Sequence, residues 1–329
     1  MTLREKQLTR FLKSRGFTWL LIIISVMAAR AVLPSPEEFI PWRLSGFWSL
    51  PLETPRLSPE ASWGIAVICC LGVCGLMVLL NRTYNLLRTV SVDFMGYFML
   101  MQVATPGLLT GFNSGLLLAI VVFCCMMLFY SVYTKENSSR RVFLVFFMLT
   151  SGAVVAHGFA VFIAVFLIGM RIMRILSMRN IMAACVGMLC PVWILWGFGV
   201  IRPLTIILPH MPQLDVFISR SDTLPLTASL TVTLIAGIFF GVANILKIVG
   251  LNSRSRDFNW LLSLVGVAAG VSMLLDFNNM TFYATLLNAV TAMQVGLYMQ
   301  IYSANRAYLA LLPLLLAYGG CYVFTILWA

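Results

Sequence analysis

The chain has 329 residues, of which 61% are apolar and 10% are charged, and its formal net charge is +11. A soluble domain is about half apolar and about one quarter charged, so this composition excludes a fold with a water-covered surface. Inside a bilayer the backbone must satisfy its own hydrogen bonds, which leaves helices or a closed barrel. The apolar runs are long and continuous rather than alternating, and they predict an all-α, polytopic helical membrane bundle.

About eleven apolar segments are expected to cross or enter the membrane in turn. Five basic residues within 1–16 keep the N-terminus in the cytoplasm. The predicted segments that follow are 17–33, 63–80, 94–108, 114–134, the two arms of 142–170, 180–201, 226–246, 258–276, 282–302 and 307–329. External loops are expected at 34–62 and 202–225. The chain 1–329 is therefore predicted to be a single integral membrane domain.

The basic residues are distributed unevenly over this topology. Of the 22 Lys and Arg residues, 17 fall in segments predicted to be cytoplasmic, four fall in external segments, and Arg30 lies in the first helix. This is the positive-inside bias of membrane proteins, and it explains the net charge without nucleic acid. We therefore expect a multi-pass protein of the inner (plasma) membrane, with membrane lipids as partners and no nucleic acid.

Residues 142–170 are almost wholly apolar, and basic residues flank them on both sides. Lys135, Arg140 and Arg141 precede the segment, and Arg171, Arg174 and Arg179 follow it. A single crossing would put one of these clusters on the wrong side of the membrane, so the sequence predicts two short helices that meet near His157 and Gly158. Each arm of about 14 residues is about 21 Å long. The hydrocarbon core is about 30 Å thick, so the tip would end inside the outer leaflet, beside a cavity.

Five residues are candidates for a site near the outer surface. Arg30 either reaches the outer head groups or faces inward and binds a phosphate. His157 either holds the hairpin turn together or belongs to the site, and Arg202, after the helix 180–201, contacts a head group or a phosphate. Glu37 and Glu38 form either a solvated acidic turn or a pair of carboxylates, in which one is a general base and the other orients it or binds a divalent metal ion.

Other polar residues in the predicted helices suggest structural roles. Asn244, Asn288 and Gln294 are expected to form hydrogen bonds between helices, as intramembrane amides usually do. The eight cysteines all lie in apolar segments and show no metal-ligand spacing, so no metal site is predicted from them.

Two family resemblances rest on the block Val142–Phe198, in which a polar-tipped apolar hairpin is followed by a basic segment and by a helix with Gly187 and Pro191. The stretch SMRNIMAACVGMLCPVWILWGFG resembles a family of polytopic inner-membrane proteins of Bacteroidota, a domain of unknown function. More distantly, the layout resembles the GT-C superfamily of glycosyltransferases that use polyprenyl-phosphate sugars. Those enzymes carry acidic residues just after the first helix, where this chain has Glu37 and Glu38.

The GT-C resemblance implies a membrane protein with an outward-facing cavity that uses a lipid-linked sugar donor in cell-envelope glycan assembly. Glu37 or Glu38 would deprotonate the acceptor or hold a divalent ion, while Arg30, His157 and Arg202 would neutralise the donor phosphate. The alternative is a transporter or flippase for an amphipathic or lipid-linked substrate, which requires polar residues through the depth of the bundle. A third hypothesis is a non-catalytic scaffold subunit, which predicts apolar filling of the hairpin cavity. Whether the protein is an enzyme stays open at this point.

Overall fold

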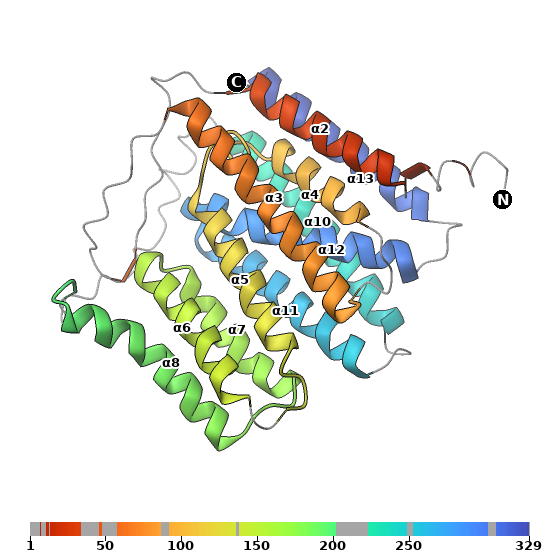
Figure 1. Ribbon diagram of the computed structural model, residues 1–329. Helices are drawn as coiled ribbons and strands as arrows, with labels where there is room; N and C mark the ends of the chain where they lie inside the picture. The colour runs from red at the N-terminus through yellow and green to blue at the C-terminus, as the bar shows by residue number, and fades with distance from the viewer. Residues whose placement is uncertain are drawn as a thin grey trace.

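The computed structural model describes residues 7, 11–12, 14–33, 46–47, 58–86, 92–135, 138–201, 223–248, 253–301 and 307–328. Within these ranges the chain forms eleven α-helices and one 3-10 turn, and no strand (Figure 1). The helices are α2 (Arg15–Ala31), α3 (Pro59–Tyr84), α4 (Asp93–Ala104), α5 (Ser114–Tyr130), α6 (Ser139–Val155), α7 (Phe159–Ile172), α8 (Met178–Gly197), α10 (Thr223–Ile248), α11 (Ser253–Leu275), α12 (Met280–Ile301) and α13 (Ala307–Trp328). Each predicted segment coincides with one of them, so the all-α fold is confirmed.

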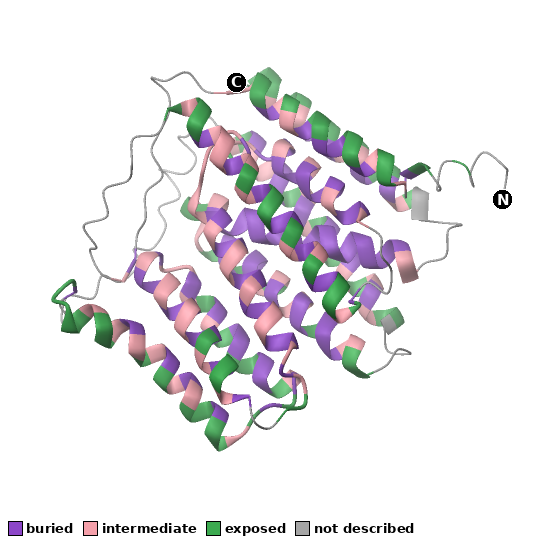
Figure 2. Cartoon of the chain, viewed as in Figure 1, coloured by how far each residue is buried: buried purple, intermediate pink, exposed green. Residues whose placement is uncertain are grey.

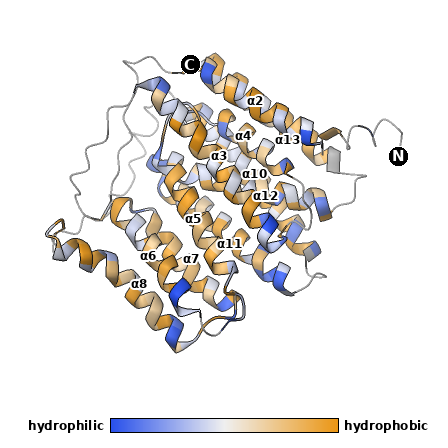
Figure 3. Cartoon of the chain, in the orientation of Figure 1, coloured by the Kyte–Doolittle hydropathy of each residue, from blue (hydrophilic) through white to orange (hydrophobic). Residues whose placement is uncertain are grey.

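Five of the described helices are long and apolar enough to cross a membrane, namely α3, α8, α10, α11 and α13. Helices α5 and α7 are apolar but shorter. Figure 3 shows the apolar positions covering the middles of the helices and the hydrophilic ones gathering toward their ends. The architecture is compatible with an integral membrane protein, because apolar side chains on the outside of a bundle need lipid as their solvent.

Polar caps define where several helices begin. The Ser14 hydroxyl accepts a hydrogen bond from the Phe17 N–H at 3.1 Å at the start of α2, and Ser177 does the same for Asn180 at 3.3 Å in α8. In α5 the cap is Asn113. Such caps satisfy backbone N–H groups that have no partner within the helix.

The helices alternate in direction, so that their ends gather at two opposite ends of the bundle. The end where α2 begins and where α3, α5 and α7 finish is called the basic end here. Three contacts tie it together: the Thr18 hydroxyl lies 3.5 Å from an Asp93 carboxylate oxygen, the Tyr84 and Tyr130 rings lie 5.6 Å apart, and Tyr130 donates a hydrogen bond to the Phe258 carbonyl at 2.8 Å.

Positive charge is concentrated at this end. Eleven of the twelve described Lys and Arg residues lie there: Arg15, Arg82, Lys135, Arg140, Arg141, Arg171, Arg174, Arg179, Lys247, Arg254 and Arg256. Two of the four described acids, Asp93 and Asp257, accompany them, whereas Arg30, Glu60 and Asp276 lie toward the opposite end. The arrangement of the helices therefore reproduces the charge asymmetry predicted from the sequence.

The segment 142–170 is a hairpin, as predicted. Helices α6 and α7 are separated by a break at residues 156–158. At the base of the hairpin the Thr134 N–H donates to the Met173 carbonyl at 3.3 Å, and the Asn180 amide donates to the Ser138 hydroxyl at 2.9 Å. Both flanking basic clusters consequently lie at the same end of the bundle.

Helix α12 forms the centre of the bundle, and α8 lies at its edge (Figure 2). Every residue from Phe282 to Met299 is buried, because α4, α5, α10 and α11 surround the helix. Helix α8 packs on α6 along one narrow face, where a Cβ on Gly187 would lie 2.6 Å from the Phe143 carbonyl oxygen. The absence of a side chain at this glycine permits the close approach of the two helices.

Candidate functional site

The five residues predicted for the site are only partly described by the structure. Glu37, Glu38 and Arg202 lie outside the described residues, so the divalent ion expected at the two glutamates stays a prediction. Arg30 lies in the last turn of α2 with an exposed side chain, and its guanidinium carbon sits 5.6 Å above the centre of the Trp63 ring at the start of α3. This geometry is that of a cation–π contact between two helix ends.

His157 lies in the turn between α6 and α7 and is half-buried. Its ring meets the Phe47 ring edge-on, with the two centres 4.7 Å apart. A Cβ on the neighbouring Gly158 would collide with the Phe282 ring and would lie 2.8 Å from the Tyr283 hydroxyl. The hairpin tip therefore packs tightly against the first turn of α12.

The two described candidates rest on different elements. Arg30 contacts α3, whereas His157 contacts Phe47 and adjoins the start of α12. Within the described residues no hydrogen bond, ion pair or ring contact joins the two side chains. Nor does this part of the chain contain a group of three or more His, Cys, Asp or Glu side chains that could hold a metal ion. Their roles in substrate binding stay predictions.

A chain of polar side chains runs through the bundle beside α12, and we call it the polar seam. Its members are Thr233 and Asn244 of α10, Asn259 and Ser263 of α11, Thr285, Asn288, Thr291 and Gln294 of α12, and Tyr318 of α13. The α12 members recur at every third residue. Nine residues of helix separate the first from the last, which is about 14 Å of rise.

Two separate hydrogen-bonded nodes lie in the seam. In the first, the Thr233 hydroxyl lies 3.1 Å from the Asn288 amide oxygen and 2.8 Å from the Tyr318 hydroxyl, which links α10, α12 and α13. In the second, the Asn244 amide donates to the Gln294 side-chain oxygen at 2.7 Å, and the Gln294 amide donates to Ser263 at 3.1 Å. The predicted interhelical bonding of Asn244, Asn288 and Gln294 is confirmed.

Several buried polar atoms of the seam have no hydrogen-bond partner among the described residues. They include the Asn288 amide nitrogen, the hydroxyls of Thr285 and Thr291, and the Asn244 amide oxygen. Both polar side-chain atoms of Gln102 on the neighbouring helix α4 also lack a hydrogen-bond partner, although this residue is fully buried. Native proteins rarely leave buried polar groups unbonded, so these atoms mark positions for water or for polar atoms of a ligand.

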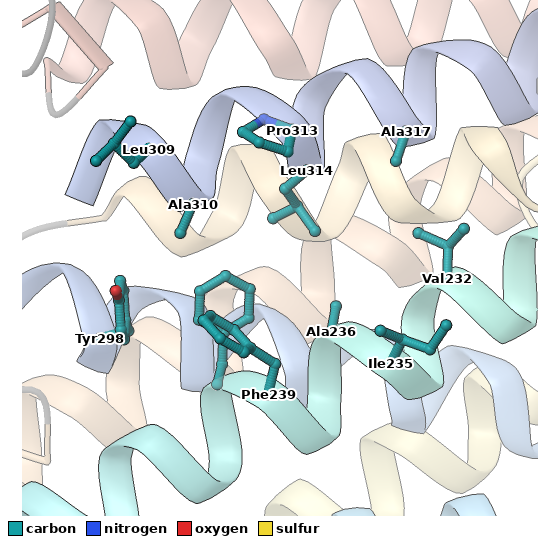
Figure 4. Close-up of a pocket in the computed structure, with 11 residues that line it drawn as sticks. Val232, Ile235, Ala236, Phe239, Tyr298, Leu309, Ala310, Pro313, Leu314 and Ala317 are labelled. Carbon is teal, nitrogen blue, oxygen red and sulfur yellow. The ribbon is translucent and has the colours of Figure 1, made fainter. Parts of the chain in front are cut away.

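An apolar groove of about 600 Å³ lies beside the seam, between α10 and α13 (Figure 4). Its floor contains the buried residues Ala236, Phe240 and Leu314, and its rim contains the exposed residues Ile235 and Leu309. In Figure 4 the side chains of the two helices face each other across it, with Tyr298 of α12 at one end.

The groove and the seam meet where α10 and α13 touch. Val232 and Ala317 line the groove, and the next residue of each helix, Thr233 and Tyr318, forms the hydrogen bond of the first node. An apolar surface open to the side of the bundle thus adjoins buried polar groups. This combination suits a molecule with an apolar and a polar part.

The sequence pointed to Asn244, Asn288 and Gln294 but not to Asn259, to the threonines of the seam or to Tyr318. The three-residue spacing of Thr285, Asn288, Thr291 and Gln294 is a signal that could have identified a row of polar side chains winding around α12. Comparison with models of protein families, with curated proteins and with solved structures gave no match to this chain. The resemblances to the Bacteroidota family and to the GT-C superfamily therefore stay predictions.

Proposed function

We propose that the chain is a polytopic inner-membrane protein that transports an amphipathic or lipid-linked molecule, as a flippase does. One observation carries the proposal: buried polar groups extend along α12 beside a groove that is apolar and open to the side. A transporter of such molecules needs polar groups through the depth of the bundle. In a core with a purely structural role, buried polar groups without a hydrogen bond only lower the stability of the fold.

The charge distribution supports an orientation for this transporter. Eleven of the twelve described Lys and Arg residues lie at the basic end, and cytoplasmic segments of membrane proteins carry such an excess. We therefore assign the basic end to the cytoplasm. The N-terminus then lies inside, and the hairpin tip with His157 points toward the outer leaflet.

The groove and the seam would divide the substrate between them. The hydrocarbon chain would lie in the groove, where Ala236, Phe240 and Leu314 offer dispersion contacts. The polar group would bond the unbonded donors of the seam, among them the Asn288 amide nitrogen, whose side-chain oxygen already bonds Thr233. In this proposal the hydrogen bond between Thr233 and Tyr318, which lies next to the groove residues Val232 and Ala317, opens when the polar group passes from the groove to the seam.

The test uses purified full-length protein in liposomes, with a fluorescent phosphatidylglycerol and a fluorescent polyprenyl phosphate as probes. Translocation is measured as the rate at which an added reductant quenches inner-leaflet probe. We expect a rate at least tenfold above that of protein-free liposomes for one probe or both. Equal rates with and without protein for both probes would contradict the proposal.

A matched pair of variants links the activity to the seam. Thr233→Val removes a hydroxyl from the seam. The control Thr231→Val removes the hydroxyl of an exposed threonine of α10, which bonds only the Thr227 carbonyl of the same helix. We expect at least a fivefold loss of translocation for Thr233→Val and less than a twofold change for Thr231→Val. Similar losses of translocation in both variants would show that the seam does not take part in transport.

The glycosyltransferase hypothesis makes a different prediction. It depends on Glu37 and Glu38, so the double variant Glu37→Gln/Glu38→Gln should abolish the cell-envelope glycan while leaving probe translocation unchanged. The scaffold hypothesis gains some support from the hairpin tip, where the rings of Phe47, Phe159 and Phe282 gather. It predicts that the protein moves neither probe and that neither glutamate matters for the glycan.

A further inference from the structure

A buried carboxylate at the basic end collects groups from three separate segments. Asp257 lies in the first turns of α11 and is 8% exposed. The Tyr133 hydroxyl donates a hydrogen bond to it at 2.8 Å, and the Nε atoms of Arg174 and Arg256 lie 3.6 and 3.9 Å from its oxygens. Burial and the bond to Asp257 raise the pKa of Tyr133, so this phenol remains a donor at neutral pH.

Two more guanidinium groups lie on neighbours of this ion pair, since the Phe258 ring next to Asp257 also meets the Tyr133 ring at 5.3 Å. The guanidinium carbon of Arg254 sits 5.3 Å above the ring centre of Phe258, and Arg141 donates to the backbone and side-chain oxygens of Ser131 at 3.0 and 2.7 Å. Arg174 and Arg256 thus pair with the carboxylate itself, while Arg254 and Arg141 contact residues close to it in the chain or in space. A structural ion pair would need only one arginine.

The arginines keep hydrogen-bonding capacity for another partner. A guanidinium carries five N–H donors, and the distances from Arg174 and Arg256 to Asp257 are longer than a hydrogen bond. Their side chains are 57% and 37% exposed. Donors in this planar arrangement match the oxygens of a phosphate group.

Aromatic packing holds the start of α11 in a fixed position. The Tyr130 ring stacks on the Phe258 ring at 4.3 Å and its hydroxyl bonds the Phe258 carbonyl at 2.8 Å, while Tyr84 meets both rings edge-on. The start of α11, which carries Arg254 and Arg256, is thereby fixed against the ends of α3 and α5. A pre-organised cluster binds an anion with less loss of conformational freedom.

The surface next to the cluster is suited to a lipid. Trp260 follows Arg256 by four residues, so both lie on one face of α11, and this tryptophan is 46% exposed. Exposed apolar residues continue further along the helix, at Val267 and Leu274 among others. Tryptophan is typical of the level of the lipid head groups, and arginine next to it meets the phosphate.

We propose that Arg174, Arg254 and Arg256 form a binding site for the phosphate group of an anionic membrane lipid, whose chains lie along α11 beyond Trp260. The site is separate from the groove between α10 and α13. It does not depend on the transport function, because a lipid bound here is a permanent or regulatory partner rather than the molecule that is moved.

The test measures binding of single lipids to purified, delipidated full-length protein by native mass spectrometry. Phosphatidylglycerol and phosphatidylcholine are the two lipid probes, and inorganic phosphate is the soluble one. We expect phosphatidylglycerol to bind at least tenfold more tightly than phosphatidylcholine. The double variant Arg174→Gln/Arg256→Gln should lose this preference, while the variant Arg82→Gln/Arg140→Gln, with the same loss of charge at the same end, should retain it within threefold.

A third variant guards against a purely structural effect. Removing Arg174 and Arg256 leaves Asp257 without its cations, which can weaken the fold itself. Arg254→Gln touches no ion pair of Asp257, so it should keep the thermal unfolding temperature of the wild type and lower phosphatidylglycerol binding at least threefold. A change in unfolding temperature with an unchanged lipid preference would overturn the proposal.

The comparison of the two kinds of probe also shows whether the site binds the phosphate of a lipid or that of a soluble compound. If inorganic phosphate binds with the same dependence on Arg174 and Arg256 and displaces the lipid at millimolar concentration, the site takes soluble phosphate compounds and the lipid assignment is overturned. Equal losses in both double variants would mean that only the overall charge of the surface attracts the lipid, which would also overturn it.

Discussion

Helices α12 and α8 have nearly the same length, 22 and 20 residues, but opposite surroundings. In α12 every residue from Phe282 to Met299 is buried, and four of the buried side chains are polar. In α8 only Asn180, Ala184, Gly187 and Pro191 are buried, and large apolar side chains project outward.

Because of this difference, hydropathy does not show which of the two helices lies in the centre. Apolar length identifies α8 as a candidate span but not α12, although α12 lies in the centre of the bundle. A helix in contact with lipid must be apolar outside, whereas an enclosed helix can carry polar groups if its neighbours bond them. A long helix that lies in the centre of the bundle and still carries uncharged polar side chains is therefore the one to search for function.

The largest expected effect comes from the same substitution in both helices. Leu286 of α12 is 0% exposed, and Leu189 of α8 is 68% exposed. Leu286→Ala should lower the free energy of unfolding by about 2–5 kcal/mol, because it opens a cavity in a packed interior. Leu189→Ala should change it by less than about 0.5 kcal/mol, as expected for a surface site. Denaturation in mixed micelles measures both, and equal losses would contradict the central position of α12.

The next effect tests whether α12 is stabilised by its polar contacts. Gln294→Leu removes the side-chain partner of the Asn244 amide, which keeps only its bond to the backbone carbonyl of residue 294, and it leaves Ser263 without its donor; the change should cost about 1–3 kcal/mol. The double variant Asn244→Leu/Gln294→Leu should be less destabilised than the sum of the two single variants, since each single change takes one hydrogen-bond partner from the side chain that remains. Strict additivity of the unfolding free energies would show that this node is not coupled.

The contact of α8 with α6 depends on one glycine. Gly187→Ala should destabilise the protein by about 1–3 kcal/mol, because the added methyl group meets the Phe143 carbonyl and the backbone cannot move aside easily. Gly75→Ala in α3 is the control, since open space surrounds that position. It should stabilise the protein by about 0.5–1 kcal/mol through helix propensity alone. A stabilising Gly187→Ala would mean that α8 is not held close to α6.

The sequence predicted much of the fold because the physical signals are local. Basic residues on both sides of 142–170 and the pair His157-Gly158 were enough for the hairpin. Element boundaries were harder: α3 begins at Pro59 rather than at residue 63, because Ser58 caps it, and α4 ends at Ala104 rather than at residue 108. A proline at the first position of a helix is compatible with its missing N–H.

The candidate sites were less predictable because they depend on how the helices are rotated. Asn288 was recognisable as an intramembrane amide, but its partner Thr233 is 55 positions away and Tyr318 bonds the same hydroxyl from a third helix. The sequence does not distinguish Asp257 from the other polar residues between the predicted segments 226–246 and 258–276. Only the approach of Arg174 and Tyr133, from two other segments, distinguishes it.

The smallest effect separates a seam hydroxyl from one at the edge of the bundle. Tyr318→Phe removes the bond to Thr233 and should cost about 0.5–1.5 kcal/mol of unfolding free energy, the usual net value of a hydrogen bond. Tyr322→Phe, one turn further along α13, removes a 3.1 Å bond to the Ala28 carbonyl of α2, at a half-buried position, and should cost less. If the proposed role of the node is correct, only Tyr318→Phe also changes the translocation rate. A larger loss of stability for Tyr322→Phe would mean that the edge of the bundle is held by polar contacts more strongly than its centre.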